Sequence, residues 1–253
     1  MEFSYVQYAL IFFGVLLAGI IDSIAGGGGL ITIPLYISIG VPESLILGTN
    51  KTASTVGGLM AISRFIKNKA IVWKEGSIAL VCSIIGSFAG AQVSNYLSSK
   101  YMIYILLFIL PVILLLNKKL NFEREEISSE LDLKTIVFRT TLIGLILGFY
   151  DGFFGPGTGT FLLIALFLYL NFNVLQASAT GRIINFSSNI SSFIYFAYSG
   201  RVMWEVALIA IVGSVLGNWI GSGLVLTKAK DVIKPVFNFV IVLLLGKCIF
   251  SLI

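Results

Sequence analysis

The sequence predicts an all-α polytopic membrane protein made of two homologous repeats, each with a glycine-broken or re-entrant helix pair and about three transmembrane helices. The chain has 253 residues, is 57% hydrophobic and only 11% charged, and has a mean hydropathy of +0.99. Several apolar stretches reach the roughly 20 residues that a transmembrane helix needs. A glycine-broken motif also occurs twice, at residues 22–30 and again at 151–159.

The composition excludes several classes of function. The net charge of +5 comes from clustered lysines and arginines, which are typical of cytoplasmic loops, and no basic stripe with exposed aromatic residues predicts a nucleic-acid partner. The chain has no histidine, and Cys82 and Cys248 both lie inside apolar segments, so we expect no disulfide, metal site or cofactor. The N-terminus lacks the pattern of a signal peptide and predicts a retained first helix.

Residues 1–117 form the first predicted repeat. An apolar helix at about 5–22 breaks at the glycines 26–29, and a short segment at 30–39 stops before Pro42. Ten helical residues reach only about 15 Å, half of the hydrocarbon core, so this pair is expected to be re-entrant or unwound. The helices that follow are expected at residues 44–65, 76–97 and 101–116.

Residues 118–134 form a charged linker, expected to be cytoplasmic, and residues 135–253 form the second repeat. The pattern restarts there with helices expected at 136–150, 161–170, 175–198, 203–226 and 232–253. At an offset of 131 residues, Thr49 aligns with Thr180, Lys51 with Arg182, and Trp73 with Trp204. Matches of such uncommon residue types predict an internal duplication.

The basic residues predict that the two repeats are inverted. With an odd number of crossings in each half, one side of the membrane holds the 64–74 cluster, the linker and the 228–234 cluster, and the other holds Lys100 and Arg201. An even number of crossings gives a less lopsided distribution and parallel halves. The first arrangement is favoured and relates the halves by an axis in the membrane plane.

Lys51 and Arg182 are the leading candidates for a functional role. Each lies several residues inside an apolar helix, where a charged side chain costs on the order of 3 kcal/mol to insert and marks a functional site by default. Their equivalent positions in the two repeats favour an anion site. The alternative is that each side chain snorkels back to the membrane interface.

The glycine breaks are suited to the same anion. A half-helix N-terminus carries unpaired N–H groups and a partial positive charge, and consecutive glycines allow close approach of the backbone. Alternatively, the glycines only allow helices to pack closely, which is the expected role of Gly86, Gly90, Gly217 and Gly221. Ser54 and Ser188 add polar groups in the same helical register as the basic residues. The residues predicted to bind substrate are Gly26, Gly27, Gly28, Gly29, Thr49, Asn50, Lys51, Gly155, Pro156, Gly157, Thr158, Gly159, Thr180, Gly181, Arg182 and Asn185.

Asp22 and Asp151 begin the two glycine-broken motifs. Each could cap the short helix that follows, pair with the basic residue of either half, or carry a coupling proton. The structural role, as a cap, is favoured for both.

These residues resemble the sulfite exporter TauE/SafE family of membrane permeases over nearly the whole chain. The resemblance rests on the Asp-x-x-x-Gly-Gly-Gly-Gly break, the Gly-Thr-Asn-Lys and Ala-Thr-Gly-Arg runs, and Gly-Pro-Gly-Thr-Gly at residues 155–159. It implies passage, in the export direction, of small sulfur-containing anions such as sulfite or organosulfonates across a bacterial or archaeal plasma membrane. The proton or another ion is a possible coupling partner. Asn50 opposite Gly181 makes the half-sites chemically unequal.

Two alternatives belong to other classes of protein. A non-transporting structural subunit of a membrane complex would have no need for the intramembrane Lys51 and Arg182. An intramembrane aspartyl protease would use Asp22 and Asp151, but the Gly-x-Gly-Asp motif of such enzymes is missing. We therefore expect a transporter and not an enzyme.

Overall fold

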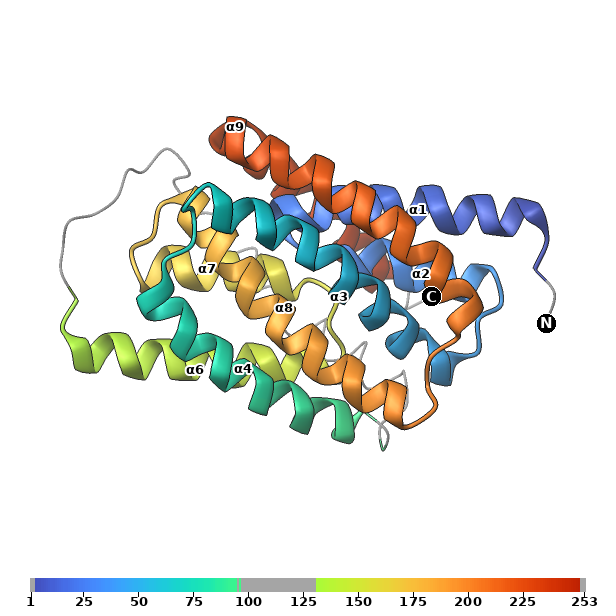
Figure 1. Cartoon of the computed structure of the whole chain (residues 1–253), viewed down its shortest axis with the longest axis horizontal. Coiled ribbons are helices and arrows are strands. Elements are labelled where there is room, and N and C mark those ends of the chain that lie inside the picture. Colours follow the sequence, from blue (N-terminus) through green and yellow to red (C-terminus); the bar gives the residue numbers. More distant parts are fainter. Residues whose placement is uncertain (1–2, 95, 97–130, 251–253) are drawn as a thin grey trace.

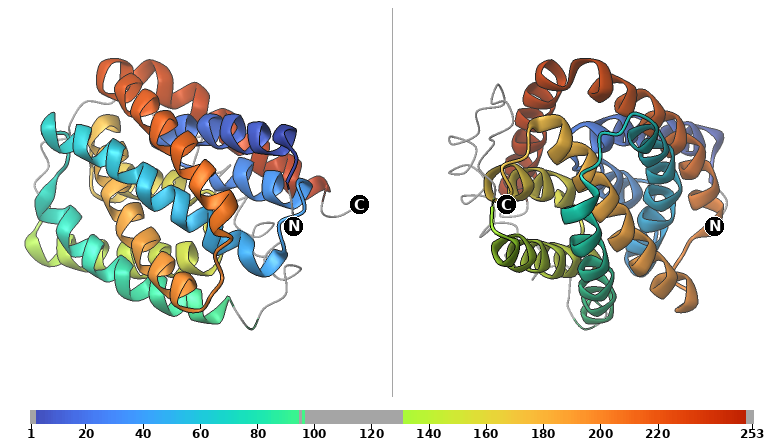
Figure 2. Two further views of the ribbon diagram at one scale, coloured as in Figure 1. Left: turned by 45° about the vertical axis from the view of Figure 1, so that its right-hand side comes forward. Right: turned by 60° about the vertical axis from the view of Figure 1, so that its left-hand side comes forward.

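The computed structural model describes residues 3–94, 96 and 131–250, and within these ranges the secondary structure is helical (Figure 1). The helices lie roughly along the long axis of the molecule and form one bundle (Figures 1 and 2). In chain order they are α1 (Tyr5–Ala25), α2 (Gly29–Ser38), α3 (Glu43–Lys67), α4 (Trp73–Val93), α6 (Leu133–Phe153), α7 (Thr158–Tyr169), α8 (Val174–Tyr198) and α9 (Trp204–Phe250).

Most predicted helices are present, with boundaries that shift by a few residues. The helix expected at 101–116 and residues 118–130 of the linker lie outside the described residues. Helix α6 begins at Leu133, three residues before the helix expected at 136–150, and the carboxylate of its N-cap Asp132 accepts a hydrogen bond from the Thr135 N–H at 3.2 Å.

The two helices expected at 203–226 and 232–253 are both present in α9, which consists of two helices joined at a kink at Lys228. The backbone of Lys228 is non-helical, with φ −141° and ψ 43°. The segment between the expected helices contains no glycine or proline, and the chain turns there at a lysine.

Four of the described helices, α1, α4, α6 and α9, are long and apolar enough to cross a membrane. Helices α3 and α8 have 25 residues each, about 37 Å of helix, but they carry many polar side chains. They pack against each other, and α9 and α4 flank them. The polar helices therefore occupy the interior of the bundle, where neighbouring helices separate them from lipid.

Each half packs a helix against the broken helix of the other half. Helix α9 lies along α1, and α4 lies along α6. A side chain at any of four glycines would overlap the facing backbone, which confirms their predicted packing role. These glycines are Gly86 and Gly90 of α4 and Gly217 and Gly221 of α9.

Backbone features of the loops recur at the predicted offset of 131 residues. Positive φ angles occur at Gly40 (88°) and Asn171 (60°), and again at Lys69 (53°) and Gly200 (69°). Helices α3 and α8 cross the bundle in opposite directions (Figures 1 and 2). These features support the duplication and its inverted orientation, both of which stay predictions.

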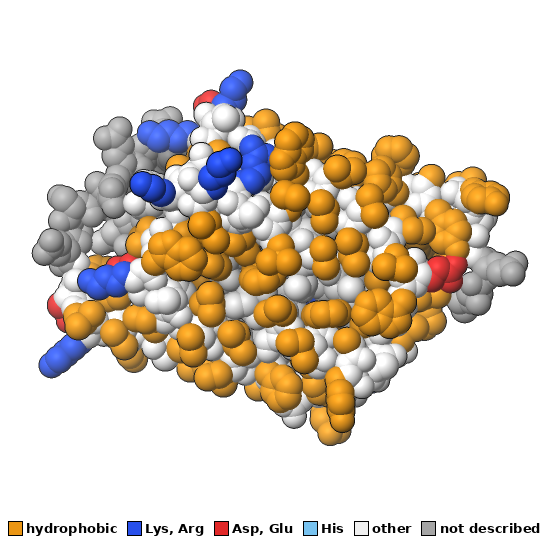
Figure 3. Space-filling model, in the orientation of Figure 1, with side chains coloured by type: hydrophobic (Ala, Val, Ile, Leu, Met, Phe, Trp, Pro, Cys, Tyr) orange, Lys and Arg blue, Asp and Glu red, His pale blue; other side chains and the backbone are white. Residues whose placement is uncertain are grey.

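The charges on the surface are strongly segregated. Apolar side chains cover the middle of the face shown in Figure 3, and its lysines and arginines gather toward the left-hand end. The α3–α4 loop, the start of α6 and the kink of α9 lie at that end (Figure 1), and the α8–α9 loop lies at the other. The basic clusters that were predicted to share one side of the membrane therefore lie at the same end of the molecule. Which side of the membrane this end faces stays a prediction.

Candidate functional site

The two helix breaks meet at the centre of the bundle. Helix α1 ends at Ala25 and α6 ends at Phe153, and α2 and α7 begin a few residues later. Gly26 has φ 77°, and a Cβ on it would overlap the backbone of Gly159. The backbones of the two breaks are therefore in direct contact, which only glycine allows.

Side chains of the second half satisfy the last carbonyl groups of α1. The Thr160 hydroxyl donates to the carbonyl of Ala25 at 2.8 Å, and the Ser178 hydroxyl donates to that of Ile24 at 3.2 Å. A broken helix at membrane depth needs such partners, because hydrocarbon offers none.

Lys51 projects from the middle of α3 and pairs with an acid of the other half. Its Nζ lies 2.7 Å from Oδ2 of Asp151 and donates to Oδ1 of Asn189 at 2.8 Å. The side chains of Lys51 and Asp151 are each only 2% exposed. Lys51 therefore does not snorkel to an interface.

The carboxylate of Asp151 has further donors around it. The Ser188 hydroxyl donates to it at 2.6 Å, and Nδ2 of Asn185 donates at 3.3 Å. The side chain of Asp151 thus makes an ion pair and hydrogen bonds with α3 and α8. The N-cap of α7 is Gly157, and no side chain caps it, so the capping role favoured for Asp151 is not what its carboxylate does here.

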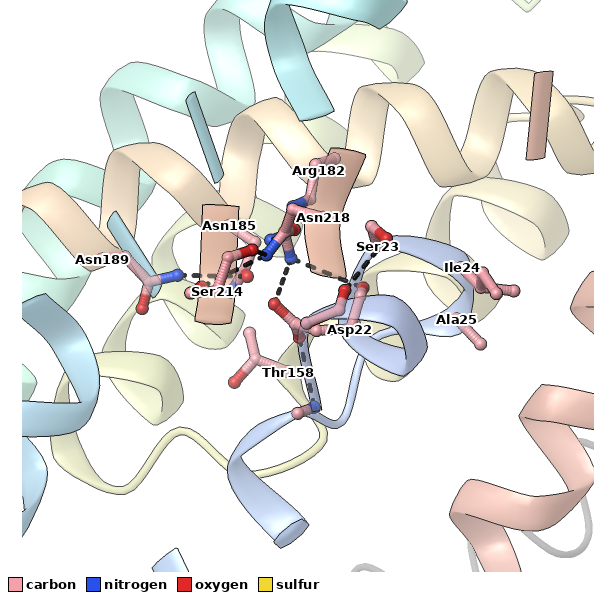
Figure 4. A network of polar contacts seen from close by, with 12 residues as sticks. Asp22, Ser23, Ile24, Ala25, Thr158, Arg182, Asn185, Asn189, Ser214 and Asn218 are labelled. Atoms are coloured by element: carbon pink, nitrogen blue, oxygen red, sulfur yellow. Dashed lines mark hydrogen bonds and ion pairs between the residues drawn. The ribbon is translucent and has the colours of Figure 1, made fainter. Parts of the chain in front are cut away.

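Arg182 of α8 makes the corresponding pair with Asp22 of the first half (Figure 4). Its Nη1 lies 2.5 Å from Oδ2 of Asp22 and also donates to the Asp22 carbonyl at 3.4 Å. Its Nη2 donates to Oδ1 of Asn218 on α9. The Arg182 Nε is buried and has no hydrogen-bond partner among the described residues.

Asp22 has a second contact besides its ion pair, although no side chain caps α2. Besides pairing with Arg182, its Oδ1 accepts a hydrogen bond from the Gly28 N–H at 3.2 Å, next to the start of α2. Asp22 therefore ties the first glycine break to the second half of the chain.

A small cavity lies where the breaks and the two polar helices meet. Its volume, the space open to the centre of a water-sized sphere, is about 20 Å³, enough for one water molecule. Ser54 and Asn189 line it together with many of the predicted site residues. These are Asp22, Gly27, Gly29, Asn50, Lys51, Asp151, Gly155, Gly157, Thr158, Gly159 and Asn185.

Two further small cavities adjoin the first through Asp22. One is lined by Gly26, Gly181 and Arg182, and the other by Gly28, Thr32 and Asn50. Most of the predicted site residues from both halves thus line three small polar cavities that share Asp22.

Three predicted site residues accept hydrogen bonds outside the cavities around Asp22. The Thr49 hydroxyl accepts a hydrogen bond from the Met203 N–H at 2.9 Å, and the Thr180 hydroxyl accepts one from the Val72 N–H at 3.0 Å. The carbonyl of Pro156 accepts a hydrogen bond from the Tyr150 hydroxyl. These three residues do not line the cavities around Asp22.

Sequence reasoning missed Asn189 and Asn218. Asn189 lies one helical turn after Asn185 on the same face of α8, a spacing that could have identified it. Asn218 lies in an apolar segment, where an amide needs a partner. Its partner could not be inferred, because the contact with Arg182 depends on how α9 packs across the halves.

The polar helices hold two ion pairs beside the crossed helix breaks, and an apolar shell suited to lipid surrounds them. This is the architecture of a multi-pass membrane transporter. Comparison with known proteins agrees with this class. The family described as sulfite exporter TauE/SafE matches residues 11–248, so the chain belongs to that family of membrane transporters.

The relatives of the chain are named as transporters too. A probable membrane transporter protein of Haemophilus influenzae is 34% identical over 246 residues, covering 96% of this chain and 94% of the relative. The probable membrane transporter protein YfcA of Escherichia coli K12 is also 34% identical over 246 residues, covering 96% and 89%. YunE of Bacillus subtilis, with the same description, is 25% identical over 252 residues, covering 90% and 92%. No solved structure matches.

Proposed function

We propose that this transporter moves small sulfur-containing oxyanions, such as sulfite or organosulfonates, and that it works as an exporter. One observation carries the proposal: each half contributes a buried basic residue, Lys51 or Arg182, next to the point where the helix breaks cross. The start of α7 lies at the same cavity, with Thr158 in its lining, and a helix start favours negative charge.

The proposed substrate class follows from chemistry and from the family. A guanidinium binds two oxygens of an oxyanion at once, and sulfite and sulfonates present such oxygens. The family that matches the chain is described as a sulfite exporter family, which supports both the sulfur chemistry and the direction.

Charge balance constrains the mechanism. Each buried base faces an acid, so the four charges sum to zero, and an anion adds a charge that the site must compensate. The central cavity has room for only one water molecule, so it is too small to hold a sulfonate. Substrate entry therefore requires that the halves separate around the breaks, as rocking of one repeat against the other would achieve.

Transport assays in proteoliposomes test the proposal. Vesicles loaded with sulfite, sulfate, thiosulfate, sulfoacetate or taurine should lose the sulfur oxyanions faster with the protein than without it. Arg182→Gln should abolish this efflux, and Lys74→Met, a matched removal of an exposed basic residue, should leave it unchanged. No flux of any of these compounds would refute the proposal and favour a structural subunit.

A further inference from the structure

The two buried ion pairs differ in how tightly the protein encloses their acids. Asp151 is 2% exposed, and Lys51, Ser188 and Asn185 all donate to its carboxylate. The side chain of Asp22 is 15% exposed and lines all three small central cavities. Asp22 is therefore the more accessible of the two acids to water and protons.

The two bases differ in whether all of their described donors have a partner. Lys51 is occupied by Asp151 and by Asn189 at 2.7 and 2.8 Å. Arg182 uses Nη1 and Nη2 but holds a buried Nε–H donor with no partner among the described residues. Arg182 also lines the cavity that contains Asp22 and Asn185. An unpartnered buried donor costs free energy and points to an acceptor that binds there during the cycle.

The surroundings of Asp22 contain few other charges. The charged groups that face it are Arg182 of α8 and, across the central cavity, Lys51 of α3 with Asp151 of α6. The break before α2 contributes the uncharged Gly28 N–H. Helices α7 and α9 contribute uncharged polar groups, among them Thr158 and Asn218 (Figure 4). Protonation of Asp22 would thus leave the guanidinium of Arg182 without its counterion.

We propose that Asp22 takes up a proton together with each anion that binds to Arg182, whereas the Lys51–Asp151 pair stays intact through the cycle. This inference rests on the proposed function and assigns unequal roles to the two halves. A proton binds Oδ2 of Asp22, its ion pair with Nη1 of Arg182 breaks, and the anion accepts hydrogen bonds from the released guanidinium. For a monovalent anion, the net charge of the site is unchanged.

The sign of the coupling follows from this exchange. Because the proton and the anion favour each other's binding, they move in the same direction, and the gradients of both determine whether export occurs. Ionised Asp22 competes with the anion for Arg182. Over the pH range in which binding takes up one proton, the affinity for an anion that does not titrate should therefore fall by about tenfold for each unit of rising pH.

Calorimetric titration of the purified protein with methanesulfonate and isethionate, which stay ionised between pH 5 and 8, tests the inference. Comparing buffers with different heats of ionisation counts the protons taken up, and we expect about one per bound anion. Asp22→Asn, which mimics the protonated acid, should bind the anion with no proton uptake and little pH dependence. Asp22→Glu should retain the proton uptake with a shifted pH midpoint.

A comparison of variants separates the two pairs. Lys51→Met/Asp151→Asn, which removes both charges of one pair, should bind more weakly but still take up one proton per anion. Arg182→Gln/Asp22→Asn should lose binding. Binding to wild type without proton uptake, or proton uptake that persists in Asp22→Asn, would overturn the coupling. Failure to bind either sulfonate, together with no flux in the proteoliposome assay, would instead refute the proposed function and the coupling with it.

Discussion

Breaking the Lys51–Asp151 pair on one side should destabilise the protein strongly. Both side chains are 2% exposed, and their charged atoms lie 2.7 Å apart. Lys51→Met leaves the carboxylate buried without its counterion, which costs about 3–5 kcal/mol. For a chain of this size each kcal/mol lowers Tm by about 2–4 °C, so the expected loss is roughly 6–20 °C.

Removing both charges should recover most of that loss. In Lys51→Met/Asp151→Asn the two neutral side chains fill similar volumes, and Ser188 can still donate to the amide oxygen at position 151. Replacing a buried ion pair by neutral groups is often close to neutral in stability. The double variant should therefore melt well above Lys51→Met, although the single losses alone would predict a lower Tm.

The assay is thermal unfolding in detergent, followed by circular dichroism and by size-exclusion chromatography after heating. Lys67→Met is the matched control, because Lys67 is exposed at the end of α3 and its removal should shift Tm by at most a degree or two. A loss below 1 kcal/mol in Lys51→Met, or a double variant no more stable than additivity predicts, would show that the pair is not the buried, coupled contact described above.

Three further predictions concern other parts of the chain. Thr49→Val should lower stability by about 1–3 kcal/mol in the same unfolding assay, because the Met203 N–H loses its acceptor, yet it should leave the substrate KM unchanged. Tyr36→Phe should be neutral or stabilising, because its buried hydroxyl has no hydrogen-bond partner among the described residues; a loss above 1 kcal/mol would contradict this. In a cysteine-free background, a cysteine at Arg201 should react with an impermeant thiol reagent in intact cells and one at Lys69 should not. Equal labelling of both would contradict the inverted topology.

Much of the fold could be predicted because the helices and their breaks depend on residues close together in the sequence. Glycine tracts inside apolar segments cannot continue a buried helix, so the breaks between α1 and α2 and between α6 and α7 follow directly from the sequence. The division of α9 into two helices could also be predicted, because the polar segment 227–231 separates two apolar runs. The abruptness of the kink at Lys228 could not, because no glycine or proline marks it.

The sequence indicated which charged residues to consider together as a site, a hypothesis that stays a prediction, but it did not indicate how they pair. Depth in an apolar helix identified Lys51 and Arg182, and the repeat identified Asp22 and Asp151 as equivalent. Which acid meets which base depends on how the halves cross, a tertiary property that spacing along the chain does not contain. Pairing with a base of either half was one of the roles considered for each acid, and in the structure each base has an acid of the opposite half beside it.

The contact between Gly26 and Gly159 has a consequence for how such a protein can change over time. The two residues touch through their backbones, so neither has a side chain whose shrinkage could make room for growth in the other. A pair of compensating substitutions, which is possible where two side chains touch, is therefore not possible at this contact. At this crossing each half of the chain fixes one residue of the other, so both positions must keep glycine together.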